Sequence, residues 1–506
     1  MSTAAEHRRA WLAALALPWI AAGWLLRAMW GYDTDRYFGF AVLPLAAYLF
    51  FLWWETRPAA QPRRAAGWTA LAVAGALTLG GGGLFLSVSP LWTFAGWVSL
   101  AGAAAMTLGL LGRAGGWPWV RGGLVPAAFA FMALPWPVTV GGPTVTWLRG
   151  INASLAADLV SVFGRPAVAH GAMIETGGGW VGVEDGCSGF VALQTALMLA
   201  VFFGELRRLR ARDRVILALG AALIALGVNL ARVTWLVWRA AHDGSGGVLA
   251  GHDAAGWAEL GVAMVAVIIW ASVYGRPAMA EEQAGGGGTP DFSPKGMLLP
   301  TATLVVALLG IAGWYALPAK MSAAHDVRWQ LVRPDAGWRV LPLAPAVLEQ
   351  LHAEQIDYTM WHDETADRDW IALHLRWGFD PALRYGPGLH GPEICLPNAG
   401  AELQAKLGVQ TVELGGVAVD FQWLRFTAGG RVFHTFSCIW DPSLARTVDV
   451  ESLAALDLAQ ERLARVRERR RQSGLERITL AVNQCRDDAE AQRLLRSMAQ
   501  RLLRRE

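Results

Sequence analysis

The sequence predicts a mainly α-helical membrane protein: a bundle of about eight transmembrane helices, a ninth span, and a C-terminal extramembrane α+β domain. Three observations predict this fold class. Hydrophobic residues make up 54% of the 506 residues and charged residues only 17%, against about 25% charged residues in soluble domains. Apolar runs long enough to cross a bilayer, which takes about 20 helical residues, recur over the first 317 positions. After them, apolar residues fall in short alternating stretches that are typical of strands.

Nine apolar runs are long enough to be spans, eight of them before a glycine-rich segment and one after it. In chain order they cover 10–30, 38–55, 66–88, 91–112, 122–141, 189–206, 214–238, 255–274 and 297–317. The first run is expected to be a retained span rather than a removable signal peptide, because Arg27 interrupts it and another span follows directly.

Changes in composition divide the chain into four parts. We predict a transmembrane bundle over 1–275, a flexible linker over 276–296, an additional transmembrane helix over 297–317 and an α+β domain over 318–506. The linker is predicted from its low-complexity run of Gly, Pro and polar residues. In the last part the expected strands are WIALHLRW, VAVDFQWLRF, RVFHTFSCIW and RITLAVNQC, and the expected helices are 452–470 and 489–503.

Arginines in the connections between spans predict the orientation of the bundle. They cluster in every second connection, most densely from Arg207 to Arg214, and are sparse in the others. Cytoplasmic connections carry an excess of basic residues, so we expect a bacterial inner-membrane protein with a cytoplasmic N-terminus. With nine spans, the connection 142–188 and everything after Leu317 then lie on the periplasmic side.

The long connection 142–188 has two expected parts. From Trp147 to Val162 apolar residues recur at helical spacing, and this helix is expected to lie along the membrane surface or pack on the bundle. After Pro166, AVAHGAMIETGGGWVGVEDGCSG is typical of a short hairpin, with Gly177–Gly179 as the turn that joins its two halves. The hairpin leads the chain into the sixth span at Cys187.

Arg232 is a charged residue inside the seventh expected span, in GVNLARVTWLVW. A charge in this position costs roughly 2.5–3.5 kcal/mol on insertion scales, so it is expected to face a cavity or a partner. Asn229 lies three residues earlier, on the same helical face. The alternative reading is a structural tie between helices.

Cys187 stands at the start of the sixth span, in VEDGCSGF. A helix N-terminus offers unpaired N–H groups and the positive end of the helix dipole, and both stabilise a thiolate nucleophile. Gly186 and Gly189 allow the backbone to approach a substrate closely, and Ser188 supplies a cap or a hydrogen bond. The alternative is a buried small residue without a role in chemistry.

A histidine is the usual group for activating a thiol near neutral pH. His252 lies at or just before the eighth span, in LAGHDAAGWAELG, and His242 follows the seventh span. Both are expected on the outer side of the membrane. His252 is favoured because it leads directly into a span whose packing can hold it.

The expected topology brings Cys187, Arg232 and His252 to one side of the membrane. A thiolate, a proton-transfer group and a fixed cation are the parts that acyl transfer needs. Cys187 is expected to attack a peptide carbonyl, His252 to move the proton between thiol and leaving amine, and Arg232 to stabilise the oxyanion. The set predicts a cysteine peptidase or transpeptidase that uses no cofactor and no metal.

In these pieces the sequence resembles the exosortase/archaeosortase family of membrane cysteine transpeptidases. The matching pieces are Cys187-Ser188-Gly189, Asn229-Leu230-Ala231-Arg232, and His252 with Gly256-Trp257, and the resemblance covers about residues 10–275. It implies substrates that are exported proteins ending in a short motif, a hydrophobic helix and a basic cluster. It also implies cleavage near that motif and transfer of the acyl end to an acceptor. Position 186 is a glycine here, whereas alanine is expected at this position in many members of the family.

The C-terminal part is similar to an accessory domain that accompanies some exosortases in exopolysaccharide loci. The similarity rests on His390-Gly391-Pro392-Glu393-Ile394-Cys395, and His434 and Cys438 follow later. Three readings stay open for these residues: a Cys395–Cys438 disulfide outside the membrane, a zinc site with the two histidines, and plain structural residues. A part in presenting the substrate or the acyl acceptor is a hypothesis without a chemical motif behind it.

Two alternatives to a sorting transpeptidase fit the same residues. A membrane cysteine protease that passes the acyl group to water needs the same thiol, histidine and arginine. A non-catalytic membrane component of exopolysaccharide assembly or transport would use Arg232 to hold an anionic headgroup. Nucleic acid is not an expected partner, because the formal net charge is only +3.

Overall fold

The computed structural model describes most of the chain. The described residues are 2–31, 36–61, 65–136, 138–183, 185–243, 252–274, 292–317, 327–333, 337–343, 348, 351, 353–364, 367–377, 391–398, 401–442, 445–448, 457–469 and 474–506. The chain divides into two compact units, Met1–Leu86 with Trp92–Ile311, and Ser87–Leu91 with Ala312–Glu506. The first unit is helical and the second is rich in β-strands.

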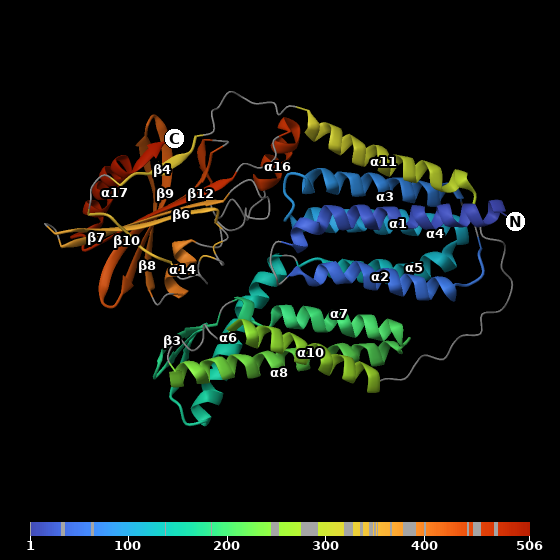
Figure 1. Cartoon of the computed structure of the whole chain (residues 1–506), viewed down its shortest axis with the longest axis horizontal. Helices are drawn as coiled ribbons and strands as arrows, with labels where there is room; N and C mark the ends of the chain where they lie inside the picture. The colour runs from blue at the N-terminus through green and yellow to red at the C-terminus, as the bar shows by residue number, and fades with distance from the viewer. Residues whose placement is uncertain are drawn as a thin grey trace. The chain divides into compact units, whose positions relative to one another are not determined.

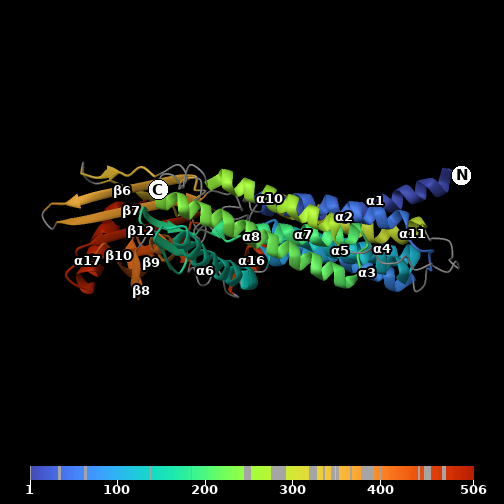
Figure 2. The ribbon, with the colours of Figure 1, turned by 90° about the horizontal axis from the view of Figure 1, so that it is seen from below.

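Long apolar helices build the first unit, as predicted. They are α1 (Ser2–Trp30), α2 (Phe38–Glu55), α3 (Ala65–Leu86), α4 (Thr93–Gly115), α5 (Trp117–Phe129), α6 (Val138–Val162), α7 (Phe190–Leu206), α8 (Ala211–Asp243), α10 (His252–Val273) and α11 (Pro294–Ala316), the last of which continues into the second unit. Among the described residues, seven of these helices are long and apolar enough to cross a membrane, namely α1 to α4, α8, α10 and α11, and α7 is a shorter apolar helix. Figures 1 and 2 show α7, α8 and α10 side by side, whereas α6 runs steeply across α8 in Figure 1.

Glycines let α3 and α4 pack backbone against backbone. A Cβ added to Gly75 would lie 2.3 Å from the backbone nitrogen of Met106, and one added to Gly102 would lie 2.3 Å from that of Leu79. Apolar side chains gain little by leaving lipid for one another, so close backbone packing is a main source of attraction between membrane helices. A side chain at either glycine would force the two helices apart.

The predicted fifth span, 122–141, is wrong as a single helix. Helix α5 ends at Phe129, a 3-10 turn covers Ala130–Ala133, and α6 begins only at Val138. Leu134 between them is extended, with φ −100° and ψ 143°. The cause is Pro135, because proline lacks an N–H donor and disfavours the helical conformation of the residue before it. The helix expected from Trp147 therefore starts earlier, at Val138.

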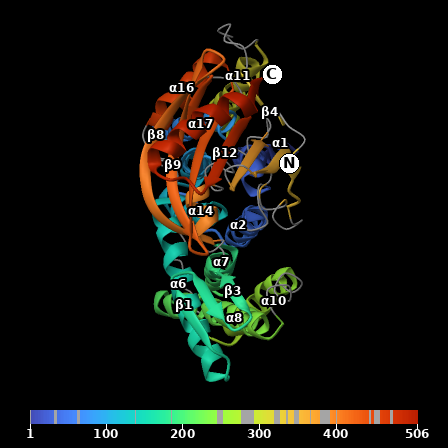
Figure 3. The ribbon, with the colours of Figure 1, turned by 90° about the vertical axis from the view of Figure 1, so that its left-hand side faces the viewer.

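Between α6 and α7 the chain forms a three-stranded antiparallel sheet rather than a two-stranded hairpin. Its strands are β1 (Ala167–His170), β2 (Met173–Thr176) and β3 (Gly179–Gly182), in the order β1-β2-β3. The predicted Gly177–Gly179 turn is confirmed, since it joins β2 to β3. The prediction missed the first turn, where Gly171 adopts φ +65°. Figure 3 shows β1 beside α6 and β3 beside α8, so the small sheet lies at one end of these helices.

An antiparallel sheet of eight strands dominates the second unit. Seven strands pair in the order β5-β6-β7-β12-β10-β9-β8, and β11 pairs with β10. The strands are β5 (Arg339–Val340), β6 (Gln355–Asp363), β7 (Arg368–Trp377), β8 (Glu402–Leu414), β9 (Val417–Ala428), β10 (Arg431–Asp441), β11 (Arg446–Val448) and β12 (Leu475–Asn483). The four predicted strands are confirmed as β7, β9, β10 and β12.

Shorter elements complete the second unit. They are β4 (Trp329–Leu331), which pairs with β13 (Leu503–Arg505), and the helices α14 (Pro392–Asn398), α16 (Asp457–Glu468) and α17 (Asp488–Leu502). The two predicted helices are confirmed as α16 and α17. The predicted linker falls mostly on residues 275–291, which lie outside the described residues.

The two faces of the large sheet differ in polarity. On one face, Phe436 belongs to a buried apolar core together with Leu495 of α17. The register places Ser437 opposite Gln422 of β9 and opposite Thr479 of β12. Because opposite residues of an antiparallel pair point to the same side, these three polar side chains share the other face.

Candidate active site

The loop that leads into α7 carries the predicted nucleophile. Cys187 ends a 3-10 turn, η3 (Asp185–Cys187), three residues before α7 begins. It is 5% exposed and belongs to a buried cluster with Ala157 of α6 and Val233 of α8. The thiol therefore lies inside the protein, where α6, α8 and the small sheet meet.

Gly189 allows α8 to reach this loop. It adopts a left-handed φ of +77°, and a Cβ in its place would lie 2.7 Å from Cγ of Asn229. Asn229 is fully buried, and its Nδ2 donates a hydrogen bond to the carbonyl oxygen of Cys187 at 3.2 Å. Only glycine suits both the backbone conformation and this close contact. Two of the predicted supporting residues, Gly189 and Asn229, are thus packed against each other beside the thiol.

Helix α6 holds the loop from another side. Nδ2 of Asn152 donates to the carbonyl oxygen of Ser188 at 2.9 Å, and Nε of Arg149 donates to that of Val183 at 2.7 Å. The Ser188 hydroxyl accepts a hydrogen bond from the Phe190 amide at the start of α7, at 3.2 Å. Sequence reasoning missed Asn152 and Arg149, because their partners are backbone groups more than 30 positions away, which no local pattern marks.

Arg232 of α8 lies beside the same loop. Its Nη1 donates to Oε2 of Glu259 on α10 at 2.9 Å and to the carbonyl oxygen of Gly186 at 3.4 Å. The Arg232 and Glu259 side chains are 8% and 6% exposed. Arg232 thus links the nucleophile loop to α10, and a carboxylate balances its charge, as the cost of a buried cation requires.

Side chains hold three consecutive carbonyl groups around the thiol. The carbonyl oxygens of residues 186–188 accept, in order, from Arg232, Asn229 and Asn152, which we call the carbonyl clamp. Peptide groups are planar, so holding these carbonyls fixes the peptide planes on both sides of Cys187. The position of the sulfur atom is therefore set jointly by α6 and α8.

Glu259 was not among the predicted site residues, although the sequence holds a signal for it. An acidic residue within the apolar run of α10 is costly in lipid and indicates a cation on a neighbouring helix. Three residues earlier, a Cβ on Gly256 would lie 3.1 Å from Nη2 of Arg232, so a glycine at this position leaves room for the guanidinium. The N-terminal half of α10 is thus shaped around Arg232.

The predicted histidine begins α10. His252 is the first residue of this helix, and the placement of its side chain lies outside what the structure describes. By helical periodicity, positions 252, 256 and 259 fall on one face of α10, the face that contacts Arg232. The competing His242 lies in the last turn of α8, exposed, about 15 Å along the helix from Arg232. The choice of His252 stays a prediction.

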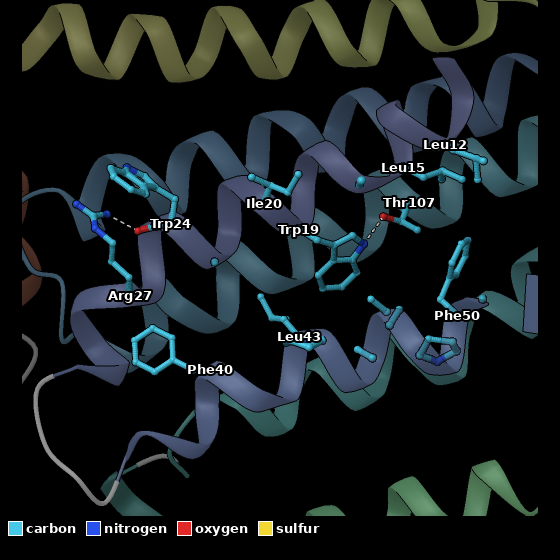
Figure 4. A pocket seen from close by; sticks show the side chains of 18 of the residues that line it. Leu12, Leu15, Trp19, Ile20, Trp24, Arg27, Phe40, Leu43, Phe50 and Thr107 are labelled. Atoms are coloured by element: carbon cyan, nitrogen blue, oxygen red, sulfur yellow. Dashed lines mark hydrogen bonds between the residues drawn. The ribbon is translucent and has the colours of Figure 1, made fainter. Parts of the chain in front are cut away.

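A cavity of about 700 Å³ lies elsewhere in the helical unit, between α1 and α2 (Figure 4). Apolar side chains such as Ile20 and Leu43 line it, and Trp19 donates a hydrogen bond to the Thr107 hydroxyl there at 2.9 Å. Its lining includes none of the three predicted catalytic residues. The cavity offers apolar shape without a nucleophile, so the chemistry is to be sought at the Cys187 loop.

The structure decides whether Cys395 and Cys438 form the disulfide considered from the sequence. Cys438 is a free thiol buried in the core that faces α17, and Cys395 is a free thiol exposed on α14, so no disulfide joins them. Burial raises the pKa of Cys438 to about 12, which keeps the thiol neutral.

The zinc reading gains no support from the described residues. Nδ1 of His434 accepts a hydrogen bond from Trp423 at 3.1 Å, which occupies a potential ligand atom. His390 lies outside the described residues, and within them no three His, Cys, Asp or Glu side chains are placed to hold a metal.

Comparison with known families bears on the helical unit. Residues 30–269 match the family model described as Transmembrane exosortase (Exosortase_EpsH), and Cys187, Arg232 and His252 all fall within the match. The comparisons with curated proteins and with solved structures gave no match. The family match and the seven apolar helices identify a multi-pass membrane protein. Over residues 30–269 the chain is therefore similar to the transmembrane exosortase family, and this similarity supports the general function of a membrane sorting transpeptidase.

Proposed function

We propose that the chain cleaves the C-terminal sorting signals of exported proteins through a thioester on Cys187. The observation that carries this proposal is the carbonyl clamp, in which side chains of α6 and α8 hold the backbone of residues 186–188. Fixed geometry of the nucleophile is what covalent catalysis requires. A cysteine that only fills apolar space has no need of three polar side chains gathered in a buried place, where each must find a partner.

In the proposed reaction, Sγ of Cys187 attacks the carbonyl carbon of the scissile peptide bond. The C–N bond breaks, the sorting signal leaves as an amine, and the acyl group stays on sulfur as a thioester. His252 takes the proton of the thiol and gives it to the leaving amine. An acceptor nucleophile then attacks the thioester and releases the thiol. When the acceptor is water, the same steps amount to hydrolysis, and the enzyme acts as a protease.

Arg232 is proposed to stabilise the oxyanion that forms on the carbonyl oxygen. A guanidinium has five N–H donors and a permanent positive charge, and both suit it to a developing oxyanion. Removing one oxyanion donor typically costs about 2.7–4 kcal/mol of transition-state stabilisation. Glu259 is proposed to keep the guanidinium in position, so that no reorganisation is needed when negative charge develops.

The proposed location is the bacterial inner membrane, with the N-terminus in the cytoplasm and the Cys187 loop and C-terminal unit on the periplasmic side. The arginine-rich connection Arg207–Arg214 supports this orientation, because it follows the end of α7 opposite to Cys187. The proposed substrates are exported proteins that end in a short motif, a hydrophobic helix and a basic cluster. The C-terminal unit is proposed to be an accessory domain in an exopolysaccharide context.

Mass spectrometry of the C-terminal peptides of envelope proteins tests the proposal. Cells with the wild-type chain are compared with cells that carry Cys187→Ala and, as a matched control, Cys485→Ala in the C-terminal unit. Tails retained only in the Cys187→Ala strain support thiol-dependent cleavage, and a mass added at the new C-terminus separates transfer from hydrolysis. Identical tails in all three strains would overturn the proposal. If Arg232→Leu then still stops polysaccharide export, the non-catalytic assembly function takes its place.

A further inference from the structure

Arg477 is a buried cation within the eight-stranded sheet. It lies on β12, is 2% exposed, and shares the polar face of the sheet with Ser437 and Thr479. Its Nη1 donates to Oγ of Ser437 at 3.2 Å, and that hydroxyl lies 2.9 Å from the Thr479 hydroxyl. Its Nε has no hydrogen-bond acceptor among the residues that the structure describes.

Two other buried arginines of this unit have a carboxylate close by. Arg465 lies 3.0 Å from Asp441, and Arg368 lies 2.9 Å from Glu490. Within the described part of the chain, no carboxylate comes within the 4.0 Å of an ion pair with Arg477. Arg477 therefore differs from its neighbours in the kind of partner it has, a neutral hydroxyl instead of an anion.

Burial without a counterion is unfavourable for a guanidinium. Burial lowers the pKa of Arg477, and the negative charge of Glu393, acting from beyond ion-pair distance, opposes this only in part. A fold that keeps such a cation at its centre gains stability when an anion enters beside it. The electrostatics of Arg477 thus favour a negatively charged ligand.

A small cavity with polar and apolar lining residues lies beside Arg477. Its volume is about 160 Å³, and its polar lining comes from Asp420, Gln422, Ser437, Thr447 and Arg477. A cavity of this size suits a small group rather than a peptide segment or a lipid chain. The amide and hydroxyl groups in its wall are partners for further polar atoms of that group.

We propose that the C-terminal unit binds a small anionic group, a carboxylate or a phosphate, in this cavity, with Arg477 as its anchor. A planar guanidinium suits both groups, because its N–H donors bind two oxygens at once. Asp420 in the same wall favours a ligand that also carries a hydroxyl or amide donor. The site does not depend on the Cys187 thiol or on the proposed transpeptidase reaction.

Hydrogen–deuterium exchange of the full chain in detergent micelles tests the site. Peptides from β10 and β12 are followed in chloride, in acetate and in inorganic phosphate at equal ionic strength. Binding to the folded unit slows exchange by about tenfold when the anion is at about ten times its dissociation constant. Slowing by acetate alone assigns a carboxylate, slowing by phosphate alone assigns a phosphate, and slowing by both assigns their shared anionic chemistry.

Two variants separate a binding role from a structural one. Arg477→Met removes the charge, so β10 and β12 are expected to exchange no faster than in the wild type in chloride and to ignore both anions. Arg368→Met is the matched control, because it leaves Glu490 without its ion-pair partner. In this variant, β10 and β12 are expected to exchange faster in chloride and still to exchange more slowly when the anion is added. A wild type that responds to neither anion, or an Arg477→Met that responds as strongly as the wild type, overturns the proposal. If a variant fails to fold, the effect of the two anions on hydrogen exchange of the wild type alone tests the proposal.

Discussion

The Oε2 atom of Glu259 lies 2.9 Å from Nη1 of Arg232, and less than a tenth of either side chain is exposed. The two residues come from α10 and α8 and are 27 positions apart in the sequence. Their ion pair joins the helix that begins at His252 to the helix that contacts Cys187 through Asn229. The charge of Arg232 is therefore balanced and directed before any substrate arrives.

Glu259→Gln tests whether this ion pair directs Arg232. The amide still accepts a hydrogen bond but leaves the buried guanidinium without a counterion. We expect the turnover of a sorting reporter in membrane vesicles to fall about tenfold to a hundredfold with little change in KM, less than the loss of about 10²–10³-fold for a missing oxyanion donor. Glu205→Gln is the control, because it removes an ion pair with Arg214 at the far end of α7. Unchanged turnover in Glu259→Gln would contradict the positioning role.

Gly189→Ala tests the contact between the nucleophile loop and α8. The added Cβ would lie 2.7 Å from Cγ of Asn229, and the backbone there has a left-handed φ of +77°. We expect a loss of about 1–3 kcal/mol of stability, from strain alone, together with loss of cleavage. Gly150→Ala on α6 is the control, because nothing lies within 4 Å of its Cβ position. Thermal unfolding in detergent and the reporter assay measure both effects, and an active, equally stable Gly189→Ala would count against the described geometry.

His434 predicts a pH dependence for the C-terminal unit. Desolvation lowers its pKa, and Asp488 opposes this only in part. A histidine whose pKa is lower in the folded state takes up a proton more readily when the protein is unfolded. Its contribution to the stability of the folded unit is therefore full above about pH 6.5 and is lost as the pH falls below that value. Hydrogen exchange of β10 peptides is expected to quicken from about pH 7 to about pH 5, after correction for the intrinsic rate.

His434→Gln isolates this contribution. Glutamine still accepts the hydrogen bond from Trp423 but does not titrate, so the pH dependence of β10 exchange is expected to flatten. His362 acts in the opposite sense, because its hydrogen bond with Asp369 raises its pKa, but it is the same in both proteins. Equal pH slopes in the wild type and His434→Gln would show that another group controls the stability.

The thiols of the C-terminal unit are expected to differ in reactivity. Burial raises the pKa of Cys438 to about 12 and that of Cys485 to about 11. Desolvation also raises the pKa of Cys395, but this residue is exposed and therefore open to a reagent. The thiolate is the reactive species, so an alkylating reagent should modify Cys395 of the native protein first and Cys438 only after unfolding. Peptide mass spectrometry over a time course measures the order. Equal rates for Cys395 and Cys438 would contradict the placement of Cys438 in the core.

Most helices and strands were predictable because each is encoded locally. Apolar runs of bilayer length and alternating strands show their pattern without reference to a partner. The break after Phe129 is the exception, since apolar character continues through 122–141 and Pro135 interrupts the helix. Hydropathy reports preference for lipid, whereas proline restricts the backbone of the residue before it.

The fold brings together three of the residues that the sequence singled out, but the sequence did not predict their partners. Asn229 and Arg232 stand out because polar and charged residues are rare within membrane spans. Cys187 stands out because it lies at the expected start of a span. Asn152 and Glu259 complete the site through contacts across 36 and 27 positions, which only tertiary packing brings about. A sequence therefore indicates which groups need a partner, whereas the fold decides which residue supplies it.

Detection of an acyl group on Cys187 tests the proposed thioester intermediate itself. Membranes that hold the chain and a reporter protein with a sorting tail are quenched in acid during turnover, and the peptide that contains Cys187 is analysed by mass spectrometry. We expect an added mass equal to the acyl part of the reporter, which hydroxylamine removes as it does thioesters and which is absent from Cys187→Ala. A reporter that loses its tail equally fast with Cys187→Ala, and leaves no adduct on the wild-type thiol, would contradict it.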